Sequence, residues 1–376
     1  MGIVSGRRRV RAVGVALALC IGLSACSGRS PATATATSTR ADAPSPSPSS
    51  TASQVPLTQA RWSQEAPLPV GVSEVGVALV GRRIHVLGGY VAGRPHSTTH
   101  LVYDVDTGTW QTGVPLPVAL DHIGTAAVGD TLYAVGGYGP SGKPTTGVWA
   151  LDPGTDTWVA RAPLPDARTA AVAAEIGGQL HLVGGRDLGG DTGRHDVYDP
   201  GSDTWTTAAP MPTPRDHAAG AVLDGQLHVT AGRPGGMTVH EVYDPASDSW
   251  HTAAPLPTGR NSVAGAVLNG QFVVIGGEDG AEQQVYSEVE AYDPSTDTWT
   301  ALPPVPQPMQ GTGAAVTDGR LFLPGGGPTA GGTDQSTLLQ VLTVPQQDPV
   351  TRSGDGLAAT GLRDSSAVHG RSIPRE

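Results

Sequence analysis

The chain has 376 residues, of which 52 are glycine and 33 are proline, and only 15% are charged. So much glycine and proline excludes a helical bundle or a long coiled coil, because both residues destabilise helix interiors. The 34 acidic and 23 basic residues give a formal net charge of -11, which argues against nucleic acid as a partner. Both cysteines, Cys20 and Cys26, lie near the N-terminus, so the rest of the chain can form no disulfide and offers no thiol nucleophile.

Residues 1–25 are predicted to form an export signal. Four arginines lie within residues 7–11, and an apolar run of 11 residues follows at 13–23. Such a run is too short to span a bilayer and suits the hydrophobic region of a signal peptide. The Leu-Ser-Ala-Cys sequence at 23–26 resembles the lipobox of bacterial lipoproteins, which implies cleavage before Cys26 and lipidation of its sulfur. The predicted location is the extracytoplasmic face of the bacterial cell membrane, and an ordinary signal peptide or a twin-arginine export signal is the alternative.

Residues 26–58 are predicted to be a disordered tether. Ser, Thr, Pro and Ala make up most of this segment, so it has almost nothing to bury. It would hold the folded domain away from the membrane surface. Residues 346–376 are polar and rich in Gly and Ser, and we expect this C-terminal tail to be disordered for the same reason.

A repeat of about 48 residues occupies the chain between positions 59 and 345. Six tryptophans recur at steps of 48, 48, 47, 45 and 49 residues, at positions 62, 110, 158, 205, 250 and 299. Each is followed 26 residues later by a Gly-Gly pair, which is replaced by Ala231-Gly232 in one repeat. This constant spacing identifies tandem copies of one supersecondary unit.

Each unit is predicted to contain four short strands. An Ala- and Val-rich run comes first, a second run ends in the Gly pair, a third ends in Tyr-Asp or a similar pair, and a fourth carries the Trp. Short β-rich runs separated by Gly, Pro and Asp are strand signals. An Asp lies six residues before five of the tryptophans, at positions 104, 152, 199, 244 and 293. Turn chemistry explains it, because Asp accepts hydrogen bonds from backbone amides two residues on, and calcium binding is the alternative.

The order Gly-Gly, Tyr-Asp, Trp at this spacing resembles the kelch repeat over about residues 60–345. The paired residues of WD repeats are absent, and the Asp-box of bacterial sialidases needs a Gly between Asp and Trp that these repeats lack. The resemblance implies an all-β fold, a six-bladed kelch β-propeller at residues 59–345 with one four-stranded sheet per repeat. The last repeat has no Trp of its own, so the lone N-terminal strand around Trp62 is expected to complete that blade and remove two exposed sheet edges.

The kelch resemblance also implies a ligand-binding mouth, where the loops before the first strands meet the loops after the second strands. The candidates before the first strands are Glu74, Asp121, His122, Arg168, Arg215, His217 and Arg260. The candidates after the Gly pairs are Tyr90, Tyr138, Arg186, Arg233 and Glu278. Arginine forks suit carboxylates and similar anions, and tyrosines suit stacking on a sugar or peptide. The four arginines of the third and fourth repeats therefore indicate an anionic ligand.

Structural roles are the alternative for several of these residues. Arg168, Arg215 and Arg260 follow a Pro-x-Pro sequence, and in kelch repeats such arginines often only pair with a neighbouring blade. His122 and His217 could form a metal pair or supply a base, but no fixed spacing of metal ligands joins them. We therefore assign neither a metal ligand nor a cofactor from the sequence.

The favoured function is that of a surface lipoprotein, monomeric, whose propeller binds a protein, peptide or glycan at its mouth rather than acting as an enzyme. The alternative is a carbohydrate-active enzyme similar to the kelch-type sialic-acid mutarotases, which would use Arg, Glu and His of the mouth as anion clamp and acid–base pair. A third possibility is a structural module without a dedicated pocket. Copper radical oxidases that resemble galactose oxidase need a tyrosine crosslinked to a cysteine, and the propeller has no cysteine, so that chemistry is excluded.

Overall fold

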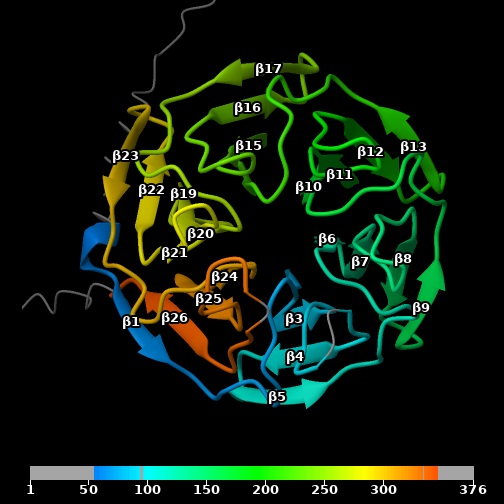
Figure 1. Cartoon of the computed structure of the whole chain (residues 1–376), viewed down its shortest axis with the longest axis horizontal. Helices are drawn as coiled ribbons and strands as arrows, with labels where there is room; N and C mark the ends of the chain where they lie inside the picture. The colour runs from blue at the N-terminus through cyan, green and yellow to red at the C-terminus, as the bar shows by residue number, and fades with distance from the viewer. Residues whose placement is uncertain (1–54, 94–95, 333, 346–376) are drawn as a thin grey trace, which may run out of the picture. The chain divides into compact units, whose positions relative to one another are not determined.

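Six four-stranded antiparallel sheets stand in a ring around a central channel (Figure 1). The structure is a computed structural model that describes residues 55–93, 96–332 and 334–345. Each sheet is one blade of a β-propeller and corresponds to one sequence repeat, which confirms the predicted all-β, six-bladed fold. The predicted signal peptide, nearly all of the tether and the C-terminal tail lie outside the described residues.

The blades follow chain order, and within each the strands run from the channel outward. Blades 1 to 3 contain β2 (Gly76–Val80), β3 (Arg83–Leu87), β4 (His100–Asp104) and β5 (Thr109–Thr112); β6 (Gly124–Val128), β7 (Thr131–Val135), β8 (Val148–Asp152) and β9 (Thr157–Ala160); β10 (Val172–Ile176), β11 (Gln179–Val183), β12 (His195–Asp199) and β13 (Thr204–Thr207). Blades 4 to 6 contain β14 (Ala219–Leu223), β15 (Gln226–Thr230), β16 (His240–Asp244) and β17 (Ser249–Thr252); β18 (Ala264–Leu268), β19 (Gln271–Ile275), β22 (Val289–Asp293) and β23 (Thr298–Ala301); β24 (Ala315–Thr317), β25 (Arg320–Pro324), β26 (Leu339–Thr343) and β1 (Arg61–Gln64).

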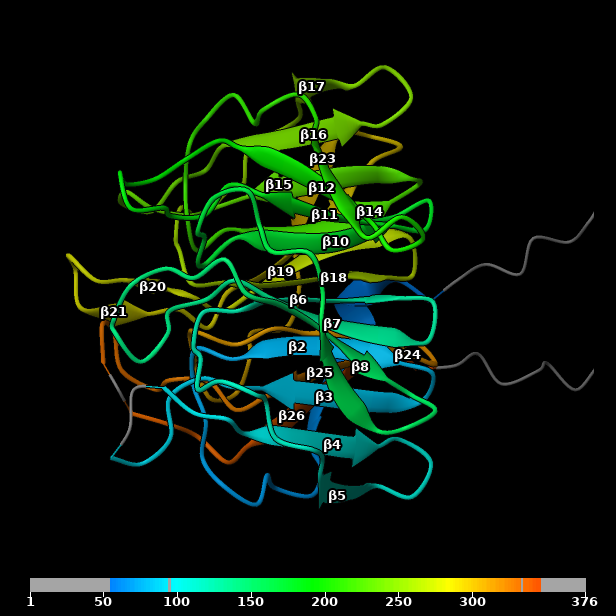
Figure 2. The same cartoon turned by 90° about the vertical axis from the view of Figure 1, so that its right-hand side faces the viewer.

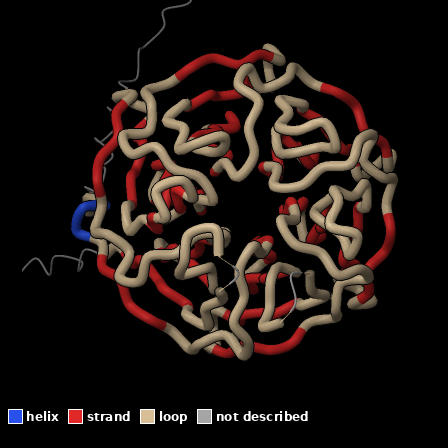
Figure 3. Tube along the Cα trace, viewed as in Figure 1, coloured by secondary structure: helices blue, strands red, loops and turns tan. Residues whose placement is uncertain are grey.

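The strands of each blade lie at increasing distances from the channel (Figure 3). The composition of each strand matches that distance. First strands are rich in Gly and Ala because six of them converge on the axis and leave little room for side chains. A Cβ added at Gly76, for example, would lie 1.9 Å from Thr125 Oγ1 of the next blade. Second strands such as β3 bury four of their five residues. Fourth strands such as β17 are largely exposed, and only the repeat Trp is half-buried. The hydrophobic core therefore lies between the blades.

The two signatures of the repeat hold neighbouring blades together. Each of the six repeat tryptophans donates from Nε1 to a backbone carbonyl that precedes a proline in the previous blade, at 2.8–3.0 Å. In the other direction, the second residue of each Gly pair donates to a carbonyl of the next blade, as Gly89 does to Leu120 at 2.8 Å. The first residue of each pair has a positive φ, and in five blades it is glycine. A Cβ at Gly136 would lie 2.2 Å from the Arg168 carbonyl oxygen, whereas blade 4 accommodates Ala231 at this position. These contacts explain why the spacing from Trp to the Gly pair does not vary.

The sixth blade is built from both ends of the described chain. β1 pairs antiparallel with β26, from Arg61 opposite Thr343 to Gln64 opposite Gln340. Leu57 in the short helix η1 (Leu57–Gln59) is buried in the core cluster between blades 5 and 6. The folded part thus begins before residue 59, the predicted boundary, because this leucine is apolar enough to be buried.

The two faces of the ring carry different loops (Figure 2). The hairpin face has the tight turns between first and second strands. The mouth face has the longer connections between second and third strands, including the hairpin of β20 (Glu278–Asp279) and β21 (Gln284–Val285), which lies at the left in Figure 2. Arg61 and Thr343 pair beside Arg320 at the start of β25, so both ends of the described chain lie at the hairpin face.

The repeated aspartates form turns on the hairpin face, as predicted. Asp104 Oδ1 accepts from the backbone amides of Asp106 and Thr107, and the other four have the same kind of contact. Among the described residues no helix has the length and apolar character needed to cross a membrane.

Candidate functional site

A ring of six residues surrounds the channel at the mouth face, one from each blade. Five of these residues lie two positions before the first strand of their blade, and the sixth lies four positions before it. Each donates its backbone N–H to the carbonyl of the preceding ring member at 2.5–3.1 Å. The six residues of this mouth ring are Glu74, His122, Ala170, His217, Ser262 and Gly311. The hydrogen bonds close into a circle, so the backbone fixes where the six side chains start.

The mouth ring requires an unusual backbone conformation. All six residues have φ between 50° and 64°, the left-handed region that β-branched residues avoid. A Cβ at Gly311 would lie 2.6 Å from Glu74 Oε1, so glycine leaves room for that carboxylate. Non-glycine residues in this region are uncommon and often occur at functional sites.

The loops predicted to form the mouth do meet there. The residue before each member of the mouth ring forms a single β-bridge with the residue directly after its own blade's Gly pair: Ser73 with Tyr90, Asp121 with Tyr138, Thr169 with Arg186, Asp216 with Arg233, Asn261 with Glu278, and Gln310 with Gly327. The two sets of predicted candidates therefore lie side by side on one face, around the channel.

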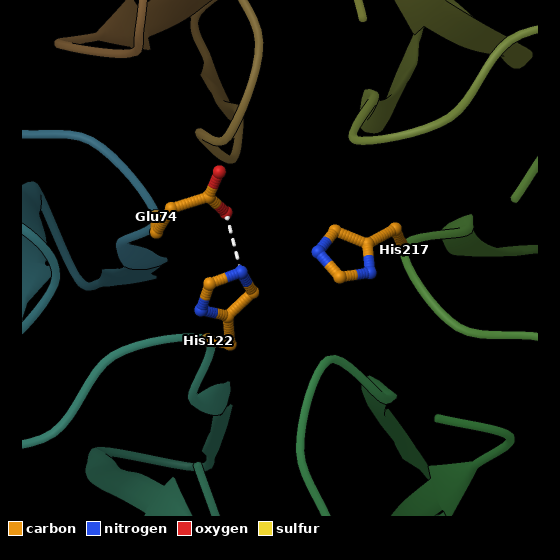
Figure 4. Close-up of side chains that lie close together, drawn as sticks. All are labelled: Glu74, His122 and His217. Atoms are coloured by element: carbon orange, nitrogen blue, oxygen red, sulfur yellow. Dashed lines mark ion pairs between the residues drawn. The ribbon is translucent and has the colours of Figure 1, made fainter. Parts of the chain in front are cut away.

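Three side chains of the mouth ring converge on one point (Figure 4). One possible ligand atom from each of Glu74, His122 and His217 lies within 4.8 Å of the other two. His122 Nε2 is 3.1 Å from Glu74 Oε2, and the imidazole centroids of His122 and His217 are 4.9 Å apart. Each side chain is at most 9% exposed. Sequence reasoning named all three but did not bring them together.

Each of the two histidines is oriented by the aspartate that precedes it. Asp121 Oδ1 lies 2.5 Å from Nδ1 of His122, and Asp216 Oδ1 lies 2.9 Å from Nδ1 of His217. Both carboxylates are buried. An Nδ1–H donated to carboxylate leaves Nε2 as the atom that faces the channel.

The two histidines have opposite pKa shifts. Burial lowers the pKa of His122, but the negative charges of Glu74 and Asp121 outweigh burial and raise it overall. Burial lowers the pKa of His217, and the charge of His122 lowers it further. The surroundings therefore favour the charged form of His122 more than that of His217.

Tyr90 and Tyr138 flank His122 from blades 1 and 2. Their rings meet the imidazole edge-on, with centroids 5.8 Å and 5.5 Å away. Burial raises the pKa of both phenols, so both remain neutral donors at physiological pH. His96 contacts the second oxygen of Asp121. This side of the mouth is an aromatic wall with buried carboxylates behind it.

A cavity of about 360 Å³ lies in the channel next to the mouth ring. Its walls are the first strands, with small side chains such as Ala78, Ala126, Ala174 and Ala221. Polar groups are concentrated at the ring, where Glu74, His122 and His217 line the cavity. Small-molecule sites commonly combine an apolar wall with a few converging polar groups.

Arg186, Arg233 and Glu278 lie at the mouth, and all three are engaged in ion pairs. Arg233 Nη2 lies 2.5 Å from Glu278 Oε1, and Arg186 Nη1 lies 2.7 Å from Asp191 Oδ1. The two arginine side chains are 39% and 47% exposed, and Glu278 is buried. Because both cations already have acidic partners, they give less support to an anionic ligand than their number in the sequence indicated.

Arg168, Arg215 and Arg260 do not reach the mouth. All three side chains are completely buried and pair with an acid on the third strand of their own blade, Asp196, Glu241 and Glu290 respectively. Their role is structural, and the partner lies in the same blade rather than in a neighbouring one. The sequence placed them near the mouth because each directly precedes one of its bridging residues, Thr169, Asp216 or Asn261.

Ala170, Ser262 and Gly311 were missed because small side chains carry no chemical signal. A positional signal was present: every member of the mouth ring lies 12 residues after a repeat Trp. Aligning the repeats on that residue would have placed Glu74, His122 and His217 in one ring.

Known proteins share this fold. The profile of the KLHDC2/KLHL20/DRC7 kelch-repeats domain matches residues 74–255 and 161–326. The chain belongs to the kelch-repeat family. Among solved kelch-like structures, one titled "Structure of YjhT" has a TM-score of 0.63 at 17% identity, covering 74% of this chain and 97% of that chain. At this identity the likeness concerns the fold, and no curated protein matches the chain.

Proposed function

We propose that this kelch protein is an extracytoplasmic lipoprotein, anchored at Cys26, that binds a small polar ligand at its channel mouth. The observation that carries the binding role is the convergence of Glu74, His122 and His217 beside a cavity of about 360 Å³. That volume suits a sugar or the end of a peptide better than a protein surface. Glycans are the class we favour, because carboxylates accept from sugar hydroxyls and Tyr90 and Tyr138 supply aromatic surface.

The position of the chain ends supports presentation of the mouth to the outside. Arg61, where β1 begins, lies at the hairpin face, and the mouth is on the opposite face. A tether that enters the propeller at the hairpin face would leave the mouth free of the anchor. The anchor itself is the prediction from the sequence at 23–26.

A mutarotase-like enzyme is the second candidate, and the contact between Glu74 and His122 favours it. Anomer exchange needs one group to remove a proton and another to donate one, and this carboxylate and imidazole lie 3.1 Å apart at the cavity. A binding module and an enzyme would use the same residues, and only the enzyme would convert the bound sugar.

The binding role is tested by titrating the full-length protein with neutral sugars, sialic and uronic acids, and cell-wall peptides, followed by calorimetry. A Tyr90→Ala, Tyr138→Ala double variant should bind at least about fivefold more weakly, because aromatic contacts contribute roughly 0.5–1.5 kcal/mol each. His251 is exposed on β17, so His251→Ala is the matched control and should bind as the unaltered protein does. If none of these sugars, acids or peptides binds, or if the double variant binds as tightly as the unaltered protein, the mouth is not the binding site.

Turnover separates the two candidates. If a bound sugar also exchanges anomers faster than in buffer, and Glu74→Gln removes that acceleration while binding persists, the protein is an enzyme. Binding without acceleration supports the binding module.

The anchor is tested separately with Cys26→Ala. Removing the acylated sulfur should move the protein from the membrane to the soluble fraction, because the lipid supplies the apolar attachment. Protein that still partitions into detergent after this change would contradict the lipoprotein assignment.

A further inference from the structure

We infer that Glu74, His122 and His217 form a binding site for one divalent transition-metal ion of the zinc class. This inference does not rest on the proposed ligand-binding function, since the metal alone can be tested. It concerns the centre of the mouth ring, where the three side chains point toward one another (Figure 4).

The three side chains have a spacing that a metal ion can bridge. Zinc binds imidazole nitrogen and carboxylate oxygen at about 2.0–2.2 Å, which puts ligand atoms of a tetrahedral site roughly 3.4 Å apart. Here one ligand atom from each residue lies within 4.8 Å of the others, and His122 Nε2 and Glu74 Oε2 are 3.1 Å apart. Rotation of side chains alone can therefore complete the site, because the hydrogen-bonded ring fixes the backbone.

The groups behind the ligands are those that metal sites use. Histidine ligands commonly donate their second ring N–H to a carboxylate, which fixes the tautomer and directs the other nitrogen at the metal. Asp121 and Asp216 hold Nδ1 of His122 and His217 in this way at 2.5 Å and 2.9 Å. The same Asp-His dipeptide thus recurs in two blades that are not adjacent, and both copies aim Nε2 at Glu74.

An unpartnered nitrogen is the second, independent observation. His217 Nε2 is buried and has no hydrogen-bond partner among the described residues, and its side chain is only 7% exposed. Leaving a buried polar atom unsatisfied costs free energy, and such atoms call for an explanation. A metal ion at the centre of the ring would be its partner.

The local charge also favours a cation. Glu74, Asp121 and Asp216 contribute three carboxylates around two imidazoles. Arg233 pairs with Glu278, and Arg186 pairs with Asp191 and lies 3.9 Å from Asp216. Two imidazoles and one carboxylate suit zinc and similar first-row ions rather than calcium or magnesium, and three protein ligands leave a coordination position open toward the cavity.

The test uses full-length, chelator-treated protein carrying Cys20→Ala and Cys26→Ala, which removes both competing thiols. Co²⁺ is titrated and followed by its visible absorption, and Zn²⁺ is then added in competition. We expect one ion per chain, displaced by Zn²⁺. His217→Asn and Glu74→Gln should each weaken Co²⁺ binding at least tenfold, whereas the exposed His251→Asn should not.

These substitutions preserve the fold. Asn tolerates the positive φ of position 217, and Gln keeps the shape of Glu74. Thermal melts of the metal-free proteins check this point, and either variant suffices if the other fails to fold. Absence of Co²⁺ and Zn²⁺ binding by the unaltered ring, or unchanged binding by a folded variant, would overturn the site.

Discussion

At the scale of single residues, the buried arginines show how a repeat can exchange one kind of packing for another. Blades 3, 4 and 5 pair Arg168, Arg215 and Arg260 with an acid on the third strand. The other three blades have Val72, Leu120 and Met309 at the arginine position, opposite Leu101, Trp149 and Gln340. The same backbone thus accepts an ion pair or a mostly apolar pair, and the two positions change together.

Breaking one of these pairs should be costly. In Arg215→Met, Glu241 keeps its charge in the interior, where its side chain is 2% exposed. We expect a loss of about 3–5 kcal/mol in the free energy of unfolding, because an uncompensated buried charge remains. Denaturant melts would measure it.

The double variant Arg215→Met, Glu241→Leu should recover most of that loss, because it imitates the apolar blades. Arg186→Ala at the exposed mouth is the control and should change stability by less than about 1 kcal/mol. A double variant as unstable as the single one would contradict this interpretation.

At the scale of elements, pairs of histidines link the second and third strands of blades 1, 3 and 4. His85 and His100, His181 and His195, and His228 and His240 lie 2.8–3.0 Å apart between ring nitrogens. The outer member of each pair also donates from Nδ1 to the carbonyl that accepts from the Trp of the next blade. Each histidine pair is therefore joined to a contact between blades.

These histidines make stability depend on pH. Burial lowers the pKa of His85, His181, His195 and His240 to about 4 and that of His228 to about 3. Between pH 6.5 and 4 the unfolded chain binds protons that the folded protein does not, so stability is lost as pH falls through this range. Each such histidine contributes a slope of up to about 1.4 kcal/mol per pH unit.

A variant with His228→Val and His240→Val tests this assignment, since blade 5 has Val273 and Val289 at the same positions. Urea melts at pH 7, 6, 5 and 4.5 should show that the variant loses less stability than the parent as pH falls. The two slopes of unfolding free energy against pH should differ by the contribution of at most two histidines. Equal slopes would mean that other groups cause the acid sensitivity.

At the scale of the whole molecule, β1 contacts both of its neighbouring blades. Trp62 donates to Pro303 of blade 5, and Ala66, just after β1, accepts from Trp110 of blade 1. The strand also covers the outer edge of β26. Without it, blade 6 would have three strands and an open edge.

A chain shortened to begin at residue 70 should therefore be destabilised by at least about 3 kcal/mol, because it loses the buried Leu57 and Leu68 together with the half-buried Trp62. A chain that begins at residue 55 keeps η1 and β1 and is the control. Calorimetric melting temperatures compare the two, and equal values would contradict a closing role for β1.

The fold could be predicted from the sequence because the tryptophans and Gly pairs make the same contacts in every blade. The acidic partners of the buried arginines could not be predicted from the sequence. Asp196, Glu241 and Glu290 lie 26–30 residues after their arginines, and the contacts depend on strand register. The mouth ring was partly predictable. Its positions follow from the 12-residue spacing, but the convergence of Glu74, His122 and His217 depends on which blades face one another and on the aspartates that orient the imidazoles.

The most direct test of the metal site in the mouth ring is anomalous diffraction at the zinc edge from crystals of the full-length protein carrying Cys20→Ala and Cys26→Ala, grown with Zn²⁺. We predict one strong peak within about 2.2 Å of Glu74, His122 Nε2 and His217 Nε2, the distance that zinc takes to such ligands. A map without a peak there, or with its strongest peak at the exposed His251, would contradict the metal site.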